Sequence, residues 1–442
     1  LRETQQYVDK ATNENARIKY IFETHFHADF VSGHVDLAKK TGATIVFGPG
    51  AETNYDAHIA KDNELFKIGN ITLKVLHTPG HTLESSTYLL IDEHGKDYAI
   101  FSGDTLFLGD VGRPDLAIKS DLTKEDLAAM LFDSLQNKIM PLADDIIVYP
   151  AHGAGSACGK NLSKETVGVL GEQKQTNYAL RSDMTKEEFV KEVLDGIPPP
   201  PQYFAKNAMM NKSGYETFET VLKKGNIPLD VDDFEAIANH ESALVLDVRH
   251  QDEFVKEHIP NSIFIGLEGG FAPWVGALIT DLKQPILLVT PTGKEKETIT
   301  RLSRVGYDHT LGYLEGGIQA WKDAGKDIET LDSISAKELA KRVKEHKLNI
   351  LDVRKEGEFQ SKHLEGDHVK NFPLDYINEN MTQIDKNKAY YVHCAGGYRS
   401  VIAASILKAR GFNQLVNIEG GFDELKNTGI PISNYVCPTT LK

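Results

Sequence analysis

Short apolar runs, separated by polar or glycine-containing turns, recur through the first half of the chain. Each run is six or seven residues long, the length of a buried strand rather than of a helix. The runs that predict strands are 18–23, 71–77, 97–103 and 145–151. Helical patterns lie between them, so residues 1–228 are predicted to form one α/β domain.

Residues 197–204, IPPPPQYF, interrupt this alternation. Proline fixes φ and has no backbone N–H, so a run of prolines excludes a helix or a central strand. The sequence predicts an extended polyproline segment here that leads out of the first domain.

The second half of the chain repeats itself with an offset of 105 residues. VLDVRHQDEF at 245–254 recurs as ILDVRKEGEF at 350–359, and the repeat also aligns His258 with His363. Strand-like runs such as PILLV and AYYVH alternate with helical patterns in each copy. The repeat therefore predicts two small α/β domains with parallel sheets. Their predicted extents are 229–328 and 334–430, followed by a tail at 431–442.

Composition narrows the functional classes. The chain has 442 residues, which suits about three domains at roughly 150 residues each. Its net charge of −15 argues against nucleic acid or an anionic membrane as a partner, because both require a basic face. No apolar run approaches the roughly 20 residues of a membrane span. Three cysteines are too few for a disulfide framework, so a cytoplasmic location is expected.

Candidate metal ligands follow all four predicted strands of the first domain. They are His25, His27 and Asp29 after the first strand, His81 after the second, Asp104 after the third and His152 after the fourth. Because sites in α/β proteins gather at the carboxyl ends of strands, we expect these side chains to converge. Imidazole and carboxylate donors in one place predict a metal site.

This ordered set resembles the metallo-β-lactamase fold superfamily, and the resemblance runs through the whole first domain. It implies an αββα sandwich. In that family one metal would face His25, His27 and His81, and a second would face Asp29, the residue at position 30 and His152, with Asp104 between them. Position 30 is Phe30, which has no donor atom. A zinc pair that activates hydroxide therefore loses support, and a mononuclear site gains it.

Two histidines and one carboxylate with open positions suit non-haem Fe(II) and oxygen chemistry. The iron-dependent persulfide dioxygenases of the superfamily resemble this chain closely. By that resemblance, a mononuclear Fe(II) would be held by His25, His81 and Asp104, and the groups that orient these ligands or bind water would be His27, Asp29 and His152. The stretch GDTLFLGDVGRPDL (103–116) also looks like the family's segment after the carboxylate. Arg113 would hold an anionic end of the substrate, with a structural ion pair as the alternative.

Members of the superfamily usually begin with a strand hairpin before the helix that leads to the histidine motif. Only 24 residues precede His25, and LRETQQYVDKA has the pattern of that helix. The resemblance therefore implies that the hairpin is missing and that one sheet edge is incomplete.

Cys394 lies between a strand and a helical run in YYVHCAGGYRS (390–400). The backbone N–H groups after it can surround an anion; they belong to Ala395, Gly396, Gly397 and Tyr398. The helix terminus together with Arg399 should favour the thiolate. An unreactive buried cysteine is the alternative. Neither Cys158 nor Cys437 has such a loop.

Cys-x4-Arg within this DVR…EF…H framework resembles rhodaneses, which carry sulfur as a cysteine persulfide. Related phosphatases need one more residue between cysteine and arginine, so phosphatase activity is disfavoured. In the first copy, Pro291 aligns with Cys394 and Lys296 with Arg399. Proline has no nucleophile, so the first copy is predicted to be an inactive spacer or docking surface.

Both halves thus resemble enzymes that handle the same kind of sulfur. We expect Fe(II)-dependent oxidation by O₂ of a low-molecular-weight thiol persulfide to sulfite and thiol. Cys394 would interconvert sulfite and thiosulfate, in either direction, in sulfide detoxification. The carrier is glutathione, coenzyme A, cysteine or bacillithiol, and a homo-oligomer is expected. Two alternatives remain open: a zinc-dependent thioester hydrolase resembling glyoxalase II, and a sulfur-trafficking sulfurtransferase without oxidation.

Overall fold

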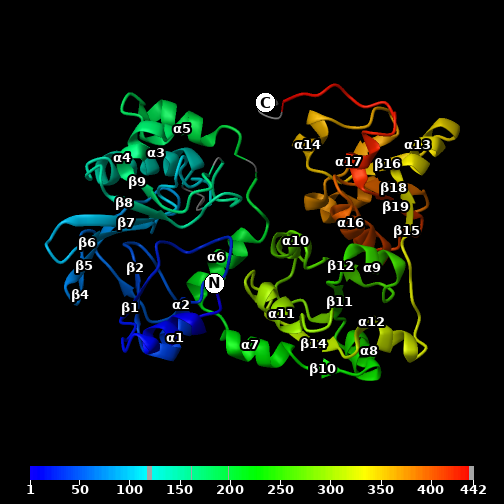
Figure 1. Ribbon diagram of the computed structural model, residues 1–442, viewed down its shortest axis with the longest axis horizontal. Coiled ribbons are helices and arrows are strands. Elements are labelled where there is room, and N and C mark those ends of the chain that lie inside the picture. Colours follow the sequence, from blue (N-terminus) through cyan, green and yellow to red (C-terminus); the bar gives the residue numbers. More distant parts are fainter. Residues whose placement is uncertain (117–121, 161, 198, 438–442) are drawn as a thin grey trace. The chain divides into compact units, whose positions relative to one another are not determined.

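The structure is a computed structural model that describes residues 1–116, 122–160, 162–197 and 199–437. It divides into two compact units, Leu1–Phe218 and Glu219–Lys442 (Figure 1). Part of the predicted tail, 438–442, lies outside the described residues. Among the described residues, no helix combines the length and the apolar character needed to cross a membrane.

Two sheets form the centre of the first unit. The smaller sheet is parallel and contains β1 (Tyr20–Phe22), β2 (Thr44–Phe47) and β3 (His58–Ile59). The larger sheet contains, in spatial order, β4 (Leu65–Ile68), β5 (Ile71–His77), β6 (Ser86–Ile91), β7 (Asp97–Gly103), β8 (Ile147–Pro150) and β9 (Gly168–Val169). All four predicted strands are present, as β1, β5, β7 and β8. Strands β2, β3, β4, β6 and β9 were not predicted.

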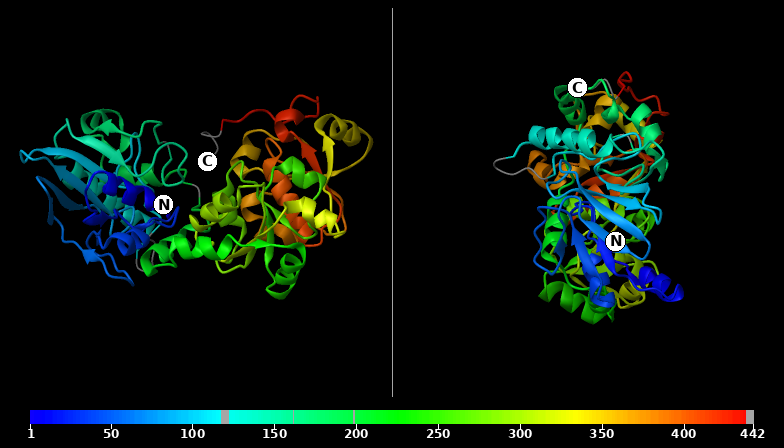
Figure 2. Two further views of the ribbon diagram at one scale, coloured as in Figure 1. Left: turned by 60° about the horizontal axis from the view of Figure 1, so that its bottom comes forward. Right: turned by 90° about the vertical axis from the view of Figure 1, so that its left-hand side faces the viewer.

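Helices cover the outer faces of both sheets (Figures 1 and 2). The small sheet packs with α1 (Gln5–Asn13) and α2 (His34–Thr41), and the large sheet with α3 (Lys124–Ser134), α4 (Leu170–Thr176) and α5 (Lys186–Leu194). Val46, Val75 and Tyr88 fill the space between the sheets. The layers are therefore helix, sheet, sheet, helix, which confirms the predicted sandwich.

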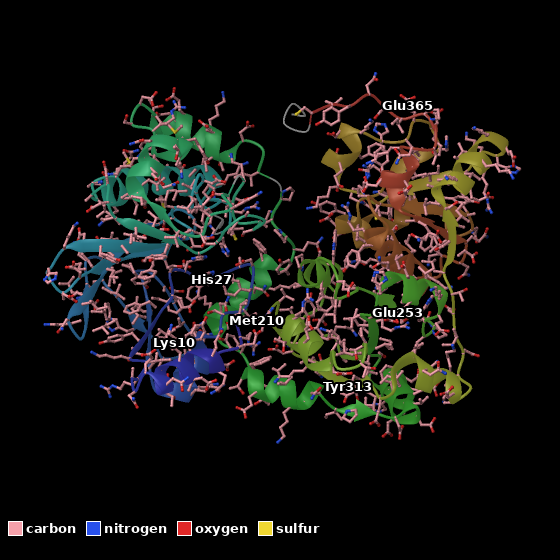
Figure 3. The ribbon with its side chains drawn as sticks, in the orientation of Figure 1. Lys10, His27, Met210, Glu253, Tyr313 and Glu365 are labelled. Carbon is pink, nitrogen blue, oxygen red and sulfur yellow. The ribbon has the colours of Figure 1, made fainter. Side chains whose placement is uncertain are left out.

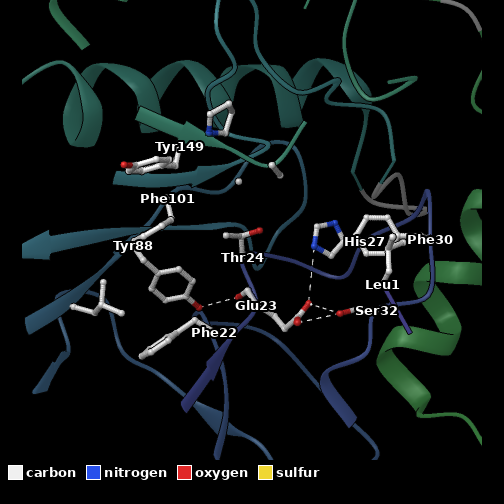
Figure 4. Close-up of a pocket in the computed structure, with 14 residues that line it drawn as sticks. Leu1, Phe22, Glu23, Thr24, His27, Phe30, Ser32, Tyr88, Phe101 and Tyr149 are labelled. Carbon is white, nitrogen blue, oxygen red and sulfur yellow. Dashed lines mark hydrogen bonds and ion pairs between the residues drawn. The ribbon is translucent and has the colours of Figure 1, made fainter. Parts of the chain in front are cut away.

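β1 lies at the edge of its sheet, and β2 is its one strand partner among the described residues. A cavity of about 510 Å³ borders this strand. Aromatic side chains from β1, β6, β7 and β8 line it: Phe22, Tyr88, Phe101 and Tyr149 (Figure 4). The cavity also reaches His27, so it adjoins the predicted metal ligands.

The sequence predicted that the proline-rich segment leads out of the first domain. In the structure this segment stays within the first unit. It leads into α6 (Phe204–Ser213), which packs against the loop after β1. Asn211 of α6 is buried, and its amide donates to the carbonyls of His27 and Phe30, each at 2.8 Å. Its Oδ1 accepts from the N–H of Ser32 at 2.8 Å. This helix, close to His27 in Figure 3, therefore fixes the loop that carries the first ligands. Residue 198 of the segment lies outside the described residues.

The second unit contains two parallel five-stranded sheets with one topology. In the first copy the spatial order is β10 (Pro228–Leu229), β14 (Thr310–Leu314), β13 (Ile286–Val289), β11 (Leu244–Asp247) and β12 (Ile263–Phe264). In the second copy it is β15 (Asp332–Ser335), β19 (Leu415–Glu419), β18 (Tyr390–His393), β16 (Asn349–Asp352) and β17 (Val369–Asn371). Every strand pair is parallel, so the predicted repeat of an α/β domain is confirmed.

Helices surround each of these sheets. α7 (Phe218–Gly225) leads into the first copy. The first copy contains α8 (Val231–His240), α9 (Gln251–Lys256), α10 (Phe271–Leu278), α11 (Glu295–Ser303) and α12 (Gly317–Asp323). The second contains α13 (Ala336–Glu345), α14 (Glu356–Ser361), α15 (Ile377–Asn380), α16 (Tyr398–Ala409) and α17 (Gly421–Leu425).

The repeated DVR motif has a structural role in both copies. Arg249 makes a two-pronged ion pair with Asp247, and its NH2 also donates to the carbonyl of Glu257 at 2.8 Å. In the second copy, Arg354 makes the same contacts with Asp352 and with the carbonyl of Lys362. The arginine therefore ties the end of a strand to the end of the following helix, which explains its presence in the copy without a cysteine.

The histidine of each repeat is also structural. His258 stacks on Phe254 with ring centroids 4.0 Å apart, and His363 stacks on Phe359 at the same distance. In both copies Nδ1 of the histidine bonds to the carbonyl of that phenylalanine. Burial lowers the pKa of His258 to about 4.

We predict that His258 makes the second unit less stable in mild acid. The unfolded chain binds a proton on His258 near pH 6.5, whereas the folded chain does so only near pH 4, so stability is lost as the pH falls between these values. The free energy of unfolding, measured with urea, should fall between pH 7 and pH 5. This fall should be about 2 kcal/mol smaller in His258→Gln than in the wild type. The exposed His240→Gln should follow the wild type. Equal losses in all three proteins would contradict the prediction.

Candidate metal centre and cysteine loop

The structure brings the six predicted ligands together at the ends of β1, β5, β7 and β8. The first set is His25, His81 and Asp104, all buried, with donor atoms within 4.8 Å of one another. The second set is His27, Asp29 and His152, grouped within the same limit. His27 is grouped with the second set, and its ring also lies beside that of His25, with centroids 4.3 Å apart. Each set holds enough donors for one ion.

Asp104 lies between the two sets. Its Oδ2 is 4.0 Å from Nε2 of His25 and 3.4 Å from Nε2 of His81, and its Oδ1 is 3.5 Å from Nε2 of His152. Two donors each about 2.1 Å from a shared ion stand roughly 3–4 Å apart, so this spacing fits a bound cation. Both carboxylate oxygens of Asp104 are buried without a hydrogen-bond partner in the described residues. Such atoms are costly unless a cation satisfies them.

Hydrogen bonds behind the imidazoles set their orientation. Nδ1 of His81 is 2.9 Å from the carbonyl of Arg113, which can only accept, so Nδ1 carries the proton and Nε2 keeps its lone pair. Nδ1 of His25 is 3.0 Å from Oγ1 of Thr24. Burial, with the neighbouring His27, holds the pKa of His25 well below its usual range. Both histidines are therefore prepared to bind metal.

Arg113 makes a structural ion pair, which is the alternative that the sequence left open. Its side chain is buried and donates from Nε and NH2 to the two oxygens of Asp115, at 2.7 and 2.8 Å. NH1 donates to the carbonyl of Ala157. The contribution of Arg113 to the site is its backbone carbonyl, which orients His81.

Phe30 packs against the second set of ligands (Figure 4). Its ring stacks on His27 with centroids 4.4 Å apart and an interplanar angle of 25°. At the edge of the His27 ring, Nε2 is 3.9 Å from Oε2 of Glu23, which also accepts from the hydroxyl of Ser32. Burial raises the pKa of Glu23 to about 7. Phe30 thus supports the His27 ring without offering a donor of its own.

Cys158 belongs to the same centre, which the sequence analysis did not establish. The side chain is buried, and its sulfur forms a third candidate set with Asp104 and His152. Burial, together with the nearby charge of Asp104, raises the pKa of the thiol. Its position six residues after His152 was the available signal.

The loop after β18 encloses Cys394, which is only 1% exposed. The N–H of Gly397 donates to its sulfur at 3.1 Å. The carbonyl of Cys394 accepts from the N–H of Phe422 at 2.7 Å. Gly421 has φ of +56°, and an added Cβ would lie 2.5 Å from that carbonyl oxygen. The Glu-Gly-Gly sequence at 419–421, which recurs at 315–317 in the first copy, therefore holds the cysteine loop by close backbone contact.

The other predicted residues of the loop have different partners. Arg399 pairs with Glu358 through two contacts of 2.6 and 2.8 Å, so its charge is shared with a carboxylate that the sequence analysis did not identify. The hydroxyl of Tyr398 donates to the carbonyl of Gly266 in the first copy. The carbonyl of Ala395 accepts from the N–H of Asp423. Among the four predicted N–H groups of residues 395–398, only that of Gly397 donates a hydrogen bond to the Cys394 sulfur.

Comparisons with known proteins agree with this architecture. A model of the metallo-beta-lactamase superfamily matches residues 9–152, and a model of the rhodanese-like domain matches 230–324 and 335–428. The crystal structure of a metallo-beta-lactamase from Staphylococcus aureus subsp. aureus COL is 32% identical, with a TM-score of 0.61. The alignment covers 71% of this chain and 89% of that one.

Curated relatives carry the name of a hydrolase. A probable hydroxyacylglutathione hydrolase of Schizosaccharomyces pombe is 31% identical over 143 residues, 32% of this chain and 51% of the relative. A hydroxyacylglutathione hydrolase of Rhodopseudomonas palustris is 30% identical over 197 residues, 39% of this chain and 72% of the relative. The chain spans about half the length of the first of these relatives.

The chain belongs to the metallo-β-lactamase superfamily. It joins a domain of that fold to two rhodanese-like domains, the second of which carries the cysteine loop. The cluster around Asp104 is the candidate metal site.

We predict that His81→Ala abolishes metal binding at the first set, because the remaining ligands His25 and Asp104 cannot complete a site. The number of metal ions per chain should fall by about tenfold or more. Inductively coupled plasma mass spectrometry of the purified protein measures it. His94→Ala, at an exposed histidine outside the cluster, should keep the wild-type content. Retention of wild-type metal content by His81→Ala would contradict the assignment.

Proposed function

We propose that the first unit oxidises a low-molecular-weight thiol persulfide with O₂, and that the second transfers its sulfur through Cys394. The observation that supports this most is the buried set of His25, His81 and Asp104 beside a phenylalanine that offers no ligand. Two histidines and one carboxylate suit a mononuclear Fe(II). The overall reaction takes one persulfide, one O₂ and one water to thiol, sulfite and two protons.

The side chains of the first unit supply a fixed and dry site for this reaction. Fe(II) bound there would supply the activation of O₂ and a position for the persulfide sulfur. The carbonyl of Arg113 fixes His81, and Thr24 fixes His25, so the ligands need no reorganisation. Burial of all three ligands excludes bulk water.

The second unit would use Cys394 as the sulfur carrier. Its thiolate accepts the outer sulfur of a persulfide, and sulfite then removes that sulfur as thiosulfate. The N–H of Gly397, already directed at the sulfur, stabilises negative charge on the thiolate and on the persulfide. Joining the two sites in one chain raises the local concentration of sulfite at Cys394 where the geometry allows transfer.

We predict that the two activities separate by mutation. With glutathione persulfide in air, His81→Ala should lower O₂ uptake and sulfite release by at least about 100-fold. Cys394→Ser should keep O₂ uptake but abolish thiosulfate, because serine cannot carry sulfur. An oxygen electrode measures O₂ uptake, and ion chromatography measures sulfite and thiosulfate. Cys437→Ser is the control cysteine variant. Undiminished thiosulfate from Cys394→Ser would rule out the carrier role, and undiminished sulfite from His81→Ala would rule out the metal assignment.

A zinc-dependent thioester hydrolase is the second candidate. Two observations favour it: His27, Asp29 and His152 still form a donor set, and curated relatives are named hydroxyacylglutathione hydrolase. Against it stands Phe30, since a metal pair needs the donor that this ring replaces.

We predict that Phe30→His raises the metal content from one toward two per chain, because the new imidazole would join His27, Asp29 and His152. O₂ uptake with glutathione persulfide should fall by about tenfold as the site becomes dinuclear. Phe30→Leu, which removes the ring without adding a donor, should keep one metal. Unchanged stoichiometry in Phe30→His would show that Phe30 only packs against His27.

A further inference from the structure

The inactive rhodanese-like copy contacts the reactive one beside the cysteine loop (Figure 1). β12 and α9 of the first copy pack against α16, the helix that begins directly after the loop. The N–H of Phe264 donates to Oγ of Ser405 at 3.0 Å. These contacts lie within one compact unit, so the two copies form one continuous structure.

Tyr398 links the cysteine loop itself to the inactive copy. Its hydroxyl donates to the carbonyl of Gly266 at 2.8 Å, and its ring meets Phe264 edge-on with centroids 5.8 Å apart. Gly269 lies so close that an added Cβ would stand 2.9 Å from the Tyr398 ring. The inactive copy therefore holds the end of the loop at Tyr398, four residues after Cys394, and the space between the copies has a defined shape.

That space is a groove of about 450 Å³. One wall is α9 of the inactive copy, which contributes Asp252 and Lys256. The opposite wall includes Gly396 and Gly397 of the cysteine loop and Glu419 at the end of β19. A volume in the range of about 300–1,000 Å³ is that of an ordinary small-molecule site, far larger than an inorganic sulfur anion requires.

The charges in the groove are of both signs and lie on both walls. Lys256 is exposed and has neither an ion pair nor a side-chain hydrogen bond within the part of the chain that the structure describes. Glu419 is an exposed carboxylate on the other wall. Asp252, four residues before Lys256 on α9, adds a second carboxylate to that wall. A groove with one cation and two carboxylates complements a ligand that carries both a carboxylate and an ammonium group.

The geometry points to this groove as the seat of an amino-acid-type thiol persulfide, with Lys256 of the inactive copy binding its carboxylate and Glu419 its ammonium group. This inference rests on the proposed role of Cys394 as sulfur carrier. The Cys394 thiolate attacks the outer sulfur of the carrier persulfide, and the carrier's S–S bond breaks. The products are the Cys394 persulfide and the carrier thiolate, which takes up the persulfide proton, so no oxidant or reductant is needed. Lys256 and Glu419 are binding residues and take no part in the bond changes.

Thiosulfate formation from sulfite under nitrogen tests this assignment, because oxidation of the persulfide cannot occur without O₂. Glutathione persulfide carries carboxylates and an ammonium group, whereas cysteamine persulfide carries the ammonium group alone. Lys256→Ala should raise KM for glutathione persulfide about three- to fivefold, leave KM for cysteamine persulfide unchanged and leave kcat unchanged for both. Glu419→Gln should raise KM for both donors to a similar degree.

Lys337→Ala is the matched control, because Lys337 is an exposed lysine of the same unit on α13, outside the groove. Equal KM values for wild type, Lys256→Ala and Lys337→Ala with glutathione persulfide would overturn the inference. An equal rise in KM for both donors in Lys256→Ala would also overturn the inference, because that pattern indicates a disturbed fold and not a lost carboxylate contact. If the wild type forms no persulfide on Cys394 with either donor, as read by mass spectrometry, the proposed sulfur transfer fails instead.

Discussion

The buried carboxylate of Asp104 is the constraint on which the first unit depends. Its two oxygens lie among His25, His81 and His152 with no hydrogen-bond partner in the described residues. Leaving such a group without a positive partner costs several kcal/mol, of the order found when a buried ion pair loses one member. A cation resolves this cost, and the hydrogen bonds behind His25 and His81 orient their lone pairs toward it. A cation bound between the two sets would therefore stabilise the fold around the site as well as supply its chemistry.

The sequence predicted the elements that depend on local pattern. Runs of apolar residues identified β1, β5, β7 and β8, and the candidate ligands at their ends do converge. The repeat identified two parallel sheets of one topology, because an internal duplication needs no knowledge of long-range contacts. The short strands β3 and β9, of two residues each, escaped prediction because pairing with a neighbour and not their own pattern creates them.

Contacts between distant segments could not be predicted. Asn211 holds the histidine loop from α6, and nothing in the proline-rich stretch before it indicates that the chain turns back. Arg113 looked available for substrate, but Asp115 two residues later takes its side chain. Glu358, which pairs with Arg399, lies in a motif that the first copy also carries, so the motif alone did not mark it as a partner of the cysteine loop.

We propose that the buried cluster holds one iron, which carries out oxygen chemistry on sulfur. Metal analysis of protein purified without added metal, combined with O₂ uptake on the same sample, tests it most directly. We expect close to one iron per chain and one O₂ consumed for each sulfite released from glutathione persulfide. Two zinc ions per chain with no O₂ uptake would contradict it and support the hydrolase.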